Sequence, residues 1–474
     1  MLGFQLVGRF AIAFFRGYSW DHTCIHGFTS NGFGGGITTA FPHAINQAAS
    51  FDVDLVARIA STVALETRAS NANSLNRTQG QALNGVNCDG GPLANNAHDP
   101  HWGRISETYG EDPHLISRIG VSALRALQNR TDGYLMTSQT TRHFIGYHQT
   151  NAMPKPDVVI SDRDLYDQFL PAYEAYQTEG EANGIMCGYA AFDKVPSCAN
   201  TRLLQTILRE QWNSDAMVQS DCCNSVNSIW SLHGYVASLE DAVAAAMNAG
   251  TQLCYMCHLQ EQDAVLAAIA HGKINESTLD AAVSRMLLTR FKHGEFDQSH
   301  PWSWITGDEI DTPQARVLAR EAAGKSAVLA VNKDRLLPLS KLPDAVAVIG
   351  PFGDCGQCYM HSYSPAGAYV NSYLNATRAH APNAAFSDGS NLANATATAA
   401  QADLVLLCLG LGQLESEGTD RAYLGYPPEQ LALWKAVRSA AKPGAKLVLV
   451  SASGGVRRRR HDFETISRAF VRLC

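Results

Sequence analysis

Hydrophobic positions between about residue 40 and residue 295 follow two spacings, one typical of amphipathic helices and one of short buried strands. Apolar residues three or four apart follow Asp52, Asp112 and Ser238, and each of these polar residues can cap the helix that it precedes. An alternation of helices and strands over this length predicts a (β/α) barrel. The strand-like runs lie at residues 143–147, 184–189 and 216–220.

The run at residues 216–220 is followed at once by a carboxylate, Asp221. Apolar spacing before it predicts a helix over Leu203–Trp212, and a later helix is expected to begin at Ser277–Asp280, a variant of the capping box. Helix, turn, strand and carboxylate make one unit of a parallel sheet, and the C-terminal ends of barrel strands line active sites. Asp221 is therefore a candidate catalytic residue, unless it merely caps the helix that follows.

The pattern changes after residue 296. Residues 297–313 combine proline, tryptophan and glycine without periodicity, which indicates a linker. We expect a barrel-like catalytic domain at 1–296, a linker at 297–325 and a second α/β domain at 326–474. Continuous apolar runs separated by helical segments predict that the second domain holds a parallel sheet covered on both faces. Those runs are residues 345–349, 404–409 and 447–450.

The composition is that of a well-packed protein, with 474 residues, 46% hydrophobic and 17% charged. This length exceeds a single core and predicts two or three domains. The net charge of −7 argues against nucleic acid or an anionic membrane as the main partner. No apolar run approaches the roughly 20 residues of a membrane helix. Residues 1–16 are apolar but broken by Arg9, and they lack a small-residue cleavage site, so they make a poor secretory signal.

Cysteines and glycosylation motifs nevertheless favour secretion. Twelve cysteines would be an unusual number of reduced thiols in a cytosolic enzyme. The pairs Cys254/Cys257 and Cys355/Cys358 have the spacing of zinc ligands but lie far apart, whereas zinc ribbons keep their pairs close, so we predict disulfides or buried thiols and no metal site. Asn-x-Ser/Thr motifs occur at Asn76, Asn129, Asn275, Asn375 and Asn394.

Several residues able to do chemistry fall in loop-like segments. Residues 99–104 place a tryptophan beside an arginine, which suits a polyhydroxylated ligand because the guanidinium donates to hydroxyls and the ring covers a sugar's apolar face. Arg142 and His143 add donors at a strand end, although each could equally serve a structural ion pair. Residues 415–421 would be a solvated turn by themselves. Together with Asp221 they offer the second carboxyl group that glycoside hydrolysis requires.

These segments occur in the order of a known family's motifs. The chain resembles glycoside hydrolase family 3 and, within it, the β-xylosidases. The resemblance extends over nearly the whole chain. Its main motifs are Asp99–Pro113, Arg142–Tyr147, Met186–Tyr189, Ser220–Cys222, Val346–Pro351 and Glu415–Arg421.

The resemblance implies a (β/α) TIM-like barrel followed by an α/β sandwich domain, with a sugar pocket between them. It implies a retaining mechanism with Asp221 as the nucleophile and Glu417 as the acid/base, without a metal or organic cofactor. The residues that it places around the terminal sugar are Arg104, Arg142, His143, Met186, Tyr189 and Thr23.

Two of these positions depart from the family pattern: the family usually has lysine where Arg142 stands, and xylosidases have glutamate where Thr23 stands. We expect both ends of the chain to be shortened relative to the family, and we expect no fibronectin type III domain of the kind that many members carry. We expect a secreted β-xylosidase that removes terminal β-D-xylosyl residues from xylo-oligosaccharides. Alternatives are a β-glucosidase, an α-arabinofuranosidase or an inactive sugar-binding relative. The expected partner is an oligosaccharide, and neither nucleic acid nor membrane.

Overall fold

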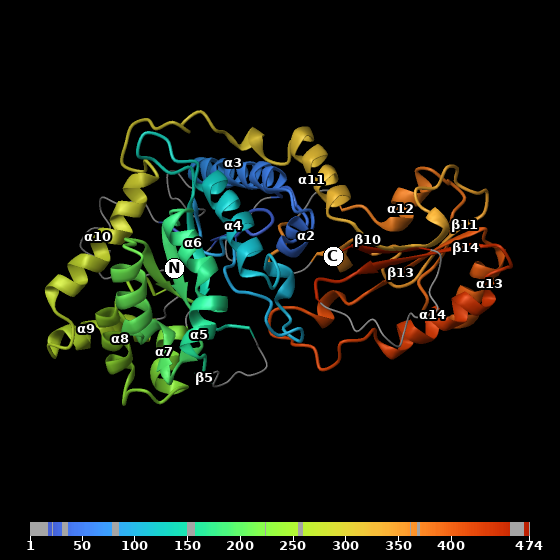
Figure 1. Ribbon diagram of the computed structural model, residues 1–474. Coiled ribbons are helices and arrows are strands. Elements are labelled where there is room, and N and C mark those ends of the chain that lie inside the picture. Colours follow the sequence, from blue (N-terminus) through green and yellow to red (C-terminus); the bar gives the residue numbers. More distant parts are fainter. Residues whose placement is uncertain are drawn as a thin grey trace.

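The computed structural model describes residues 18–20, 22–30, 37–77, 85–148, 157–222, 224–254, 259–360, 362–366, 370–455 and 469–473. The poor secretory signal at residues 1–16 and Cys257 lie outside these ranges. Figure 1 shows a helix-rich region drawn in blue to yellow and a second region, drawn in orange to red, that is built around one sheet. The helix α11 (Pro313–Lys325) leads from the first to the second, so the expected linker ends in a helix.

Parallel strands organise the first region, as neighbours in the order β3, β4, β6, β9. Single parallel bridges extend this series from Gly90 to Thr23 at one side and from Gln219 to Leu253 at the other. The series confirms the α/β, TIM-like class expected for this region. The bounds are Asn87–Cys88 for β3, Ser138–Phe144 for β4, Gly184–Cys187 for β6 and Met217–Ser220 for β9.

Helices follow these strands and pack around them. They are α2 (Ala44–Ala49), α3 (Val53–Arg77), α4 (Pro113–Gln128), α5 (Asp162–Asp164), α6 (Pro171–Thr178), α7 (Asn224–Ser231), α8 (Leu239–Ala249), α9 (Leu259–Ala270) and α10 (Glu276–Lys292). The predicted helix at 203–212 is η4 (Arg202–Gln211), whose turns are wider than α-helical ones. Short strands complete the region: β1 (His22–Thr23), β2 (Thr29–Ser30), β5 (Asp157–Val158), β7 (Ala191–Phe192) and β8 (Val195–Pro196).

Three predicted helix caps are confirmed. The side chains of Asp52, Asp112 and Ser238 accept backbone N–H bonds at 2.9, 2.7 and 3.1 Å in the first turns of α3, α4 and α8. The start predicted at Ser277 is wrong, because α10 begins at Glu276 and is capped by Asn275. The side-chain Oδ1 of Asn275 accepts the N–H of Thr278, the third helical residue, at 2.8 Å, and the Ser277 hydroxyl donates to that same oxygen.

The strand predicted at residues 143–147 is displaced, because β4 runs from Ser138 to Phe144. Its first residues, Ser-Gln-Thr-Thr, are polar and yet buried. Two of their side chains donate hydrogen bonds within the barrel, Gln139 to the Thr137 hydroxyl at 2.7 Å and Thr141 to the Gly184 carbonyl at 3.4 Å. An apolar pattern therefore cannot mark the start of this strand, whereas its end, which carries His143, lies where the prediction placed functional donors.

The second region holds a six-stranded sheet in the order β10, β15, β14, β13, β11, β12. All neighbours are parallel except β10 and β15. Apolar clusters on the two faces of β11 and β13 confirm a sheet covered on both sides. The elements are β10 (Val328–Asn332), β11 (Val346–Ile349), α12 (Tyr373–Arg378), β12 (Ala385–Ser387), α13 (Leu392–Gln401), β13 (Leu404–Gly410), α14 (Pro428–Ala440), β14 (Lys446–Ala452) and β15 (Ala469–Leu473).

Disulfides join Cys24 to Cys88, Cys187 to Cys198 and Cys355 to Cys358. The Cys355/Cys358 pair is thus a disulfide, one of the two states predicted for it. Among the described residues, the helices are all too short or too polar to cross a bilayer.

Candidate active site

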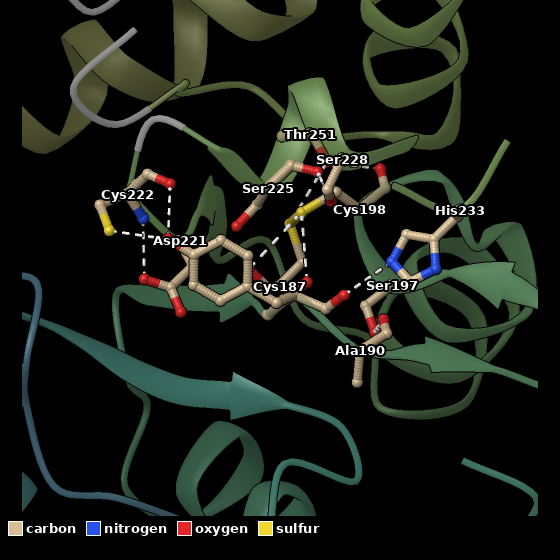
Figure 2. The surroundings of a disulfide bond; sticks show 12 residues. Cys187, Ala190, Ser197, Cys198, Asp221, Cys222, Ser225, Ser228, His233 and Thr251 are labelled. Carbon is tan, nitrogen blue, oxygen red and sulfur yellow. Dashed lines mark hydrogen bonds between the residues drawn. A yellow bond between two sulfur atoms is a disulfide. The ribbon is translucent and has the colours of Figure 1, made fainter. Parts of the chain in front are cut away.

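Asp221 lies at the C-terminal end of β9, and only 8% of its surface is exposed. Its N–H donates to the Cys187 carbonyl at 2.9 Å, which ties the strand end to β6. Its Oδ1 accepts the N–H of Cys222 at 2.7 Å, and Figure 2 shows the two residues facing each other across this bond. The donor residue, Cys222, precedes the first residue of α7. The turn directly after the strand therefore orients the Asp221 carboxylate at the C-terminal ends of the parallel strands.

Three charged side chains bear on the ionisation of Asp221. Burial raises the pKa of its carboxyl above the ordinary value, because the charged form loses water. The guanidinium groups of Arg142 and Arg104 pull the pKa down, and the carboxylate of Glu417 raises it. Asp221 and Glu417, from different regions of the molecule, are thus electrostatically coupled.

His143 stands beside Asp221, with its Nε2 3.7 Å from Asp221 Oδ2. Burial and the two arginines lower the pKa of His143 well below its usual range, so the ring is neutral. Its Nδ1 lies 3.1 Å from the side-chain oxygen of Asn95, which can only accept. Nδ1 therefore carries the proton, and Nε2 is left as an acceptor beside the carboxylate.

Arg104 connects the two regions. Its Nε and one terminal nitrogen donate to both oxygens of Glu107 at 2.8 and 2.7 Å, and the other terminal nitrogen donates to Glu417 Oε1 at 3.0 Å. Arg142 lies 3.4 Å from the same Glu107. Glu107 is fully buried, and this charge explains how two guanidiniums can be packed side by side.

The loop after β13 presents Glu417 to this cluster. The Glu417 side chain is 47% exposed, and its backbone N–H donates to the Ser362 hydroxyl at 3.2 Å. Glu415, two residues earlier, is buried and accepts from the Ser453 hydroxyl and the Gly455 N–H at 2.9 and 3.1 Å. The two glutamates therefore differ in kind, because Glu415 braces the loop and Glu417 is accessible.

Backbone contacts dock this loop on the first region. Asp420 accepts the N–H of Gly103 at 3.0 Å, and the N–H of Arg421 donates to the His101 carbonyl at 2.7 Å. A side chain at residue 103 would lie 2.1 Å from the Thr419 carbonyl oxygen, so only glycine permits this approach. The docking places Glu417 next to Arg104, which follows Gly103 directly.

The remaining predicted site residues lie around the same strand ends. Thr23 is buried in β1, and its hydroxyl lies 3.5 Å from Asp89 Oδ1. Met186 is buried in β6, where it pairs with Gln219, two residues before Asp221. Tyr189, in the loop after β6, donates from its hydroxyl to the Cys222 carbonyl at 2.9 Å. Thr23 and Met186 therefore lie in strands, and Tyr189 in a loop at a strand end, of the same parallel series that carries His143 and Asp221.

Two further residues of this cluster, Asp89 and Tyr363, are not predicted from the sequence. Asp89 is a buried carboxylate that raises the pKa of Arg142, and it directly follows the strand β3. The signal that found Asp221, an apolar run that ends in an acidic residue, is weak at Asp89, because Asn87 interrupts the apolar residues before it. Tyr363 stacks on Arg142 and Arg104, with ring centroid distances of 4.6 and 5.6 Å. Its segment gives no local signal, because the contact joins residues more than two hundred positions apart.

Two carboxyl groups at one cluster of hydrogen-bond donors are the arrangement expected of a glycoside hydrolase. Models of the glycosyl hydrolase family 3 N terminal domain and C-terminal domain match residues 19–289 and 327–469. The chain belongs to glycosyl hydrolase family 3. No group of three or more metal-binding side chains that could hold an ion is found among the described residues.

Named relatives point in the same direction. A probable exo-1,4-beta-xylosidase, bxlB of Aspergillus terreus, is 32% identical over 92% of this chain and 58% of its own length. Probable beta-D-xylosidase 7 of Arabidopsis thaliana is 33% identical over 91% and 59%. The chain thus spans less than two thirds of the curated relatives that it matches.

Solved structures share the fold. The GH3 exo-beta-xylosidase XlnD, in complex with a xylobiose aziridine probe, is 27% identical with a TM-score of 0.87, over 96% of this chain and 60% of that one. A beta-glucosidase from Listeria innocua in complex with isofagomine is 26% identical with a TM-score of 0.82, over 95% and 61%.

Proposed function

We propose that this protein is a retaining, exo-acting β-xylosidase that removes terminal β-D-xylosyl residues from xylo-oligosaccharides. One observation carries the proposal: Arg104 binds Glu417 of the second region at 3.0 Å and bears electrostatically on Asp221 of the first. Two carboxyl groups held at one site by different regions can flank a single glycosidic bond.

In the proposed first step, Glu417 gives its proton to the leaving glycosidic oxygen while Asp221 attacks the anomeric carbon. The carbon–oxygen bond breaks, and a covalent glycosyl–Asp221 ester forms. Glu417 then takes a proton from water, whose oxygen attacks the same carbon and releases Asp221. The two environments suit these roles. The Cys222 N–H fixes the Asp221 carboxylate and the charges of Arg142 and Arg104 favour its ionised form, whereas the Glu417 side chain is accessible to the water that it must activate.

The other side chains of the cluster supply hydrogen bonds to the sugar. Arg142 and the Thr23 hydroxyl donate to sugar hydroxyls, and the neutral His143 accepts one at its Nε2. Arg142 replaces a lysine of the family, and its planar guanidinium lies under the Tyr363 ring at 4.6 Å. We propose that Met186 and Tyr189 line the apolar face of the same sugar.

Xylose as the terminal sugar is supported by the names of the curated relatives. Because β-glucosidases are among the structural neighbours, the terminal sugar has to be measured. Side-by-side kcat/KM values on aryl β-xyloside, β-glucoside and α-arabinofuranoside decide it. The xyloside is expected to be preferred, and a higher value on either other glycoside would overturn the sugar assignment.

The catalytic roles are tested by trapping and rescue. A 2-fluoro-xyloside is expected to add one glycosyl group to Asp221, located by peptide mass spectrometry. With azide, Asp221→Gly should form the α-xylosyl azide and Glu417→Gly the β-xylosyl azide, because azide then approaches from opposite faces of the sugar. Xylose binding without trapping or rescue would show a sugar-binding protein and no retaining enzyme.

Secretion is part of the proposal, although the first 16 residues make a poor signal. Three disulfides join described cysteines, which is typical of proteins that fold in an oxidising compartment. The asparagines of all five glycosylation motifs are exposed, so each can carry a glycan: Asn76, Asn129, Asn275, Asn375 and Asn394. Mass spectrometry of protein from a secreting eukaryotic host, before and after glycan removal, tests this point.

A further inference from the structure

The loop between β6 and β7 carries Tyr189 and is fastened at both sides. Cys187, the last residue of β6, is disulfide-bonded to Cys198 of the short helix η3 (Ser197–Ala199). On the other side, the hydroxyl and N–H of Ser197 donate to the Ala190 carbonyl at 2.6 and 3.0 Å. Figure 2 shows the disulfide between Asp221 on one side and His233 on the other.

His233 holds the middle of this loop. Its Nε2 lies 2.9 Å from the carbonyl oxygen of Tyr189, and because a carbonyl only accepts, Nε2 is the donor. His233 follows α7, and its backbone N–H donates to the Ser228 carbonyl at 2.8 Å. The chain therefore leaves Asp221, passes through α7 and returns at His233 to the loop of Tyr189.

The contacts then lead back to the carboxylate. The hydroxyl of Tyr189 donates to the Cys222 carbonyl at 2.9 Å and lies 2.8 Å from the Cys222 sulfur. The N–H of Cys222 donates to Asp221 Oδ1 at 2.7 Å. Tyr189 thus fixes the residue whose N–H orients the carboxylate, and His233 fixes the peptide of Tyr189.

We propose that His233 is a positioning residue for the nucleophile and acts through Tyr189. Its imidazole donates to the Tyr189 carbonyl, so it sets where the Tyr189 hydroxyl lies relative to the Asp221–Cys222 turn. Without the His233 bond, the loop stays anchored at Cys187 and Ala190, but the Tyr189 hydroxyl is no longer held at the Cys222 carbonyl. This inference rests on the proposed role of Asp221.

The test compares His233→Met with His233→Gln, whose side-chain amide keeps an N–H near the place of Nε2. His233→Met is expected to lower kcat on aryl xyloside and the rate of 2-fluoro-xyloside trapping by about 3- to 10-fold, the effect of one neutral hydrogen bond. KM should stay near the wild-type value, and His233→Gln should restore most of the rate. If His233→Met does not melt cooperatively, His233→Asn, whose amide is too short to reach the carbonyl, replaces it.

A double-mutant cycle with Tyr189→Phe separates positioning from a general structural role. If His233 acts through the Tyr189 hydroxyl, His233→Met adds little to the loss already caused by Tyr189→Phe. Losses that multiply, or wild-type rates in both His233 variants, would overturn the inference. A wild-type protein inactive on all three aryl glycosides would instead overturn the proposed function, so the two failures are distinguishable.

Discussion

Asp221 and Glu417 both interact with Arg104, one through its charge and the other through a hydrogen bond, but they belong to regions that hold them in different ways. Asp221 is 8% exposed at the end of a buried parallel strand, and the N–H of the next residue fixes its carboxylate. The Glu417 side chain is 47% exposed in a long loop of the second region. One carboxyl group is positioned by the sheet itself, and the other depends on how its loop is braced and docked.

In the second region the backbone of the Glu417 loop is held in place, whereas the Glu417 side chain is not. Behind Glu417, Glu415 bonds to Ser453 and Gly455, and Asp420 bonds to Gly103 of the first region. These contacts fix the backbone of the loop and leave the Glu417 carboxyl open. A proton donor that must alternate between leaving group and water needs such access, whereas a nucleophile needs one orientation.

The largest effect is expected for Asp221→Asn, which preserves the shape of the side chain and removes its charge. We expect kcat on aryl xylosides to fall by about 10⁴-fold or more, because Asp221 is the group that we propose forms the glycosyl ester. The loss should be the same for good and poor leaving groups. Asp388→Asn, a change of the same kind at an exposed position of the second region, is the control and should leave kcat unchanged. Activity retained by Asp221→Asn would move the nucleophile elsewhere.

Glu417→Gln should behave differently, because a proton donor matters only when the leaving group needs one. We expect a loss of about 10²- to 10⁴-fold on xylobiose and a much smaller loss on an activated aryl xyloside. Plots of log kcat/KM against leaving-group pKa should be steeper for this variant than for the wild type. The same change at Glu415 should not steepen the plot, since Glu415 is buried against Ser453. Equal plots for both variants would contradict the division of roles.

Much of this arrangement can be predicted from the sequence because its signals are local. The strand ending in Asp221, the caps at Asp52 and Asp112, and the apolar runs of the second sheet all lie within a few residues of the feature they indicate. Asp89 lacks such a signal, because the two-residue strand before it, Asn87–Cys88, is not an apolar run.

What the sequence cannot supply is contact over long separations and burial of polar strands. Tyr363 covers Arg142 from the other region, and nothing near residue 363 indicates it. Residue pattern also cannot tell Glu415 from Glu417. Only the resemblance pointed to Glu417, and the structure separates the two by burial. The start of β4 is missed because its polar residues are buried, as at Gln139, whose side-chain N–H donates to the Thr137 hydroxyl.

The docking of the Glu417 loop can be disturbed at Gly103 without touching a charged group. In Gly103→Ala the new methyl group would meet the Thr419 carbonyl at 2.1 Å, so the loop must shift away from the first region. A displacement of about 1 Å costs up to about 10²-fold in rate, and we expect kcat on xylobiose to fall 10- to 100-fold. Gly324→Ala, where a methyl group meets nothing in α11, is the matched control and should be neutral or stabilising. Equal rates in both variants would show that the loop does not need this contact.

The smallest expected effect is on stability: the substitutions Asp221→Asn and Asp388→Asn should change Tm at pH 7 in opposite directions. Burial raises the pKa of Asp221, so the folded state holds its proton to higher pH than the unfolded state does, and ionisation costs stability as pH rises above about 4. Asp221→Asn removes that cost and should raise Tm at pH 7, with the gain shrinking as pH falls toward 4. Asp388 has its pKa lowered by bonds from Ser390, so Asp388→Asn should lower Tm at pH 7, and its loss should also shrink in acid. Calorimetric scans from pH 3.5 to 7 compare the two variants. A lower Tm for Asp221→Asn at pH 7 would mean that attraction to Arg104 and Arg142 exceeds the cost of burying the Asp221 charge. The ionised carboxylate would then stabilise the folded state.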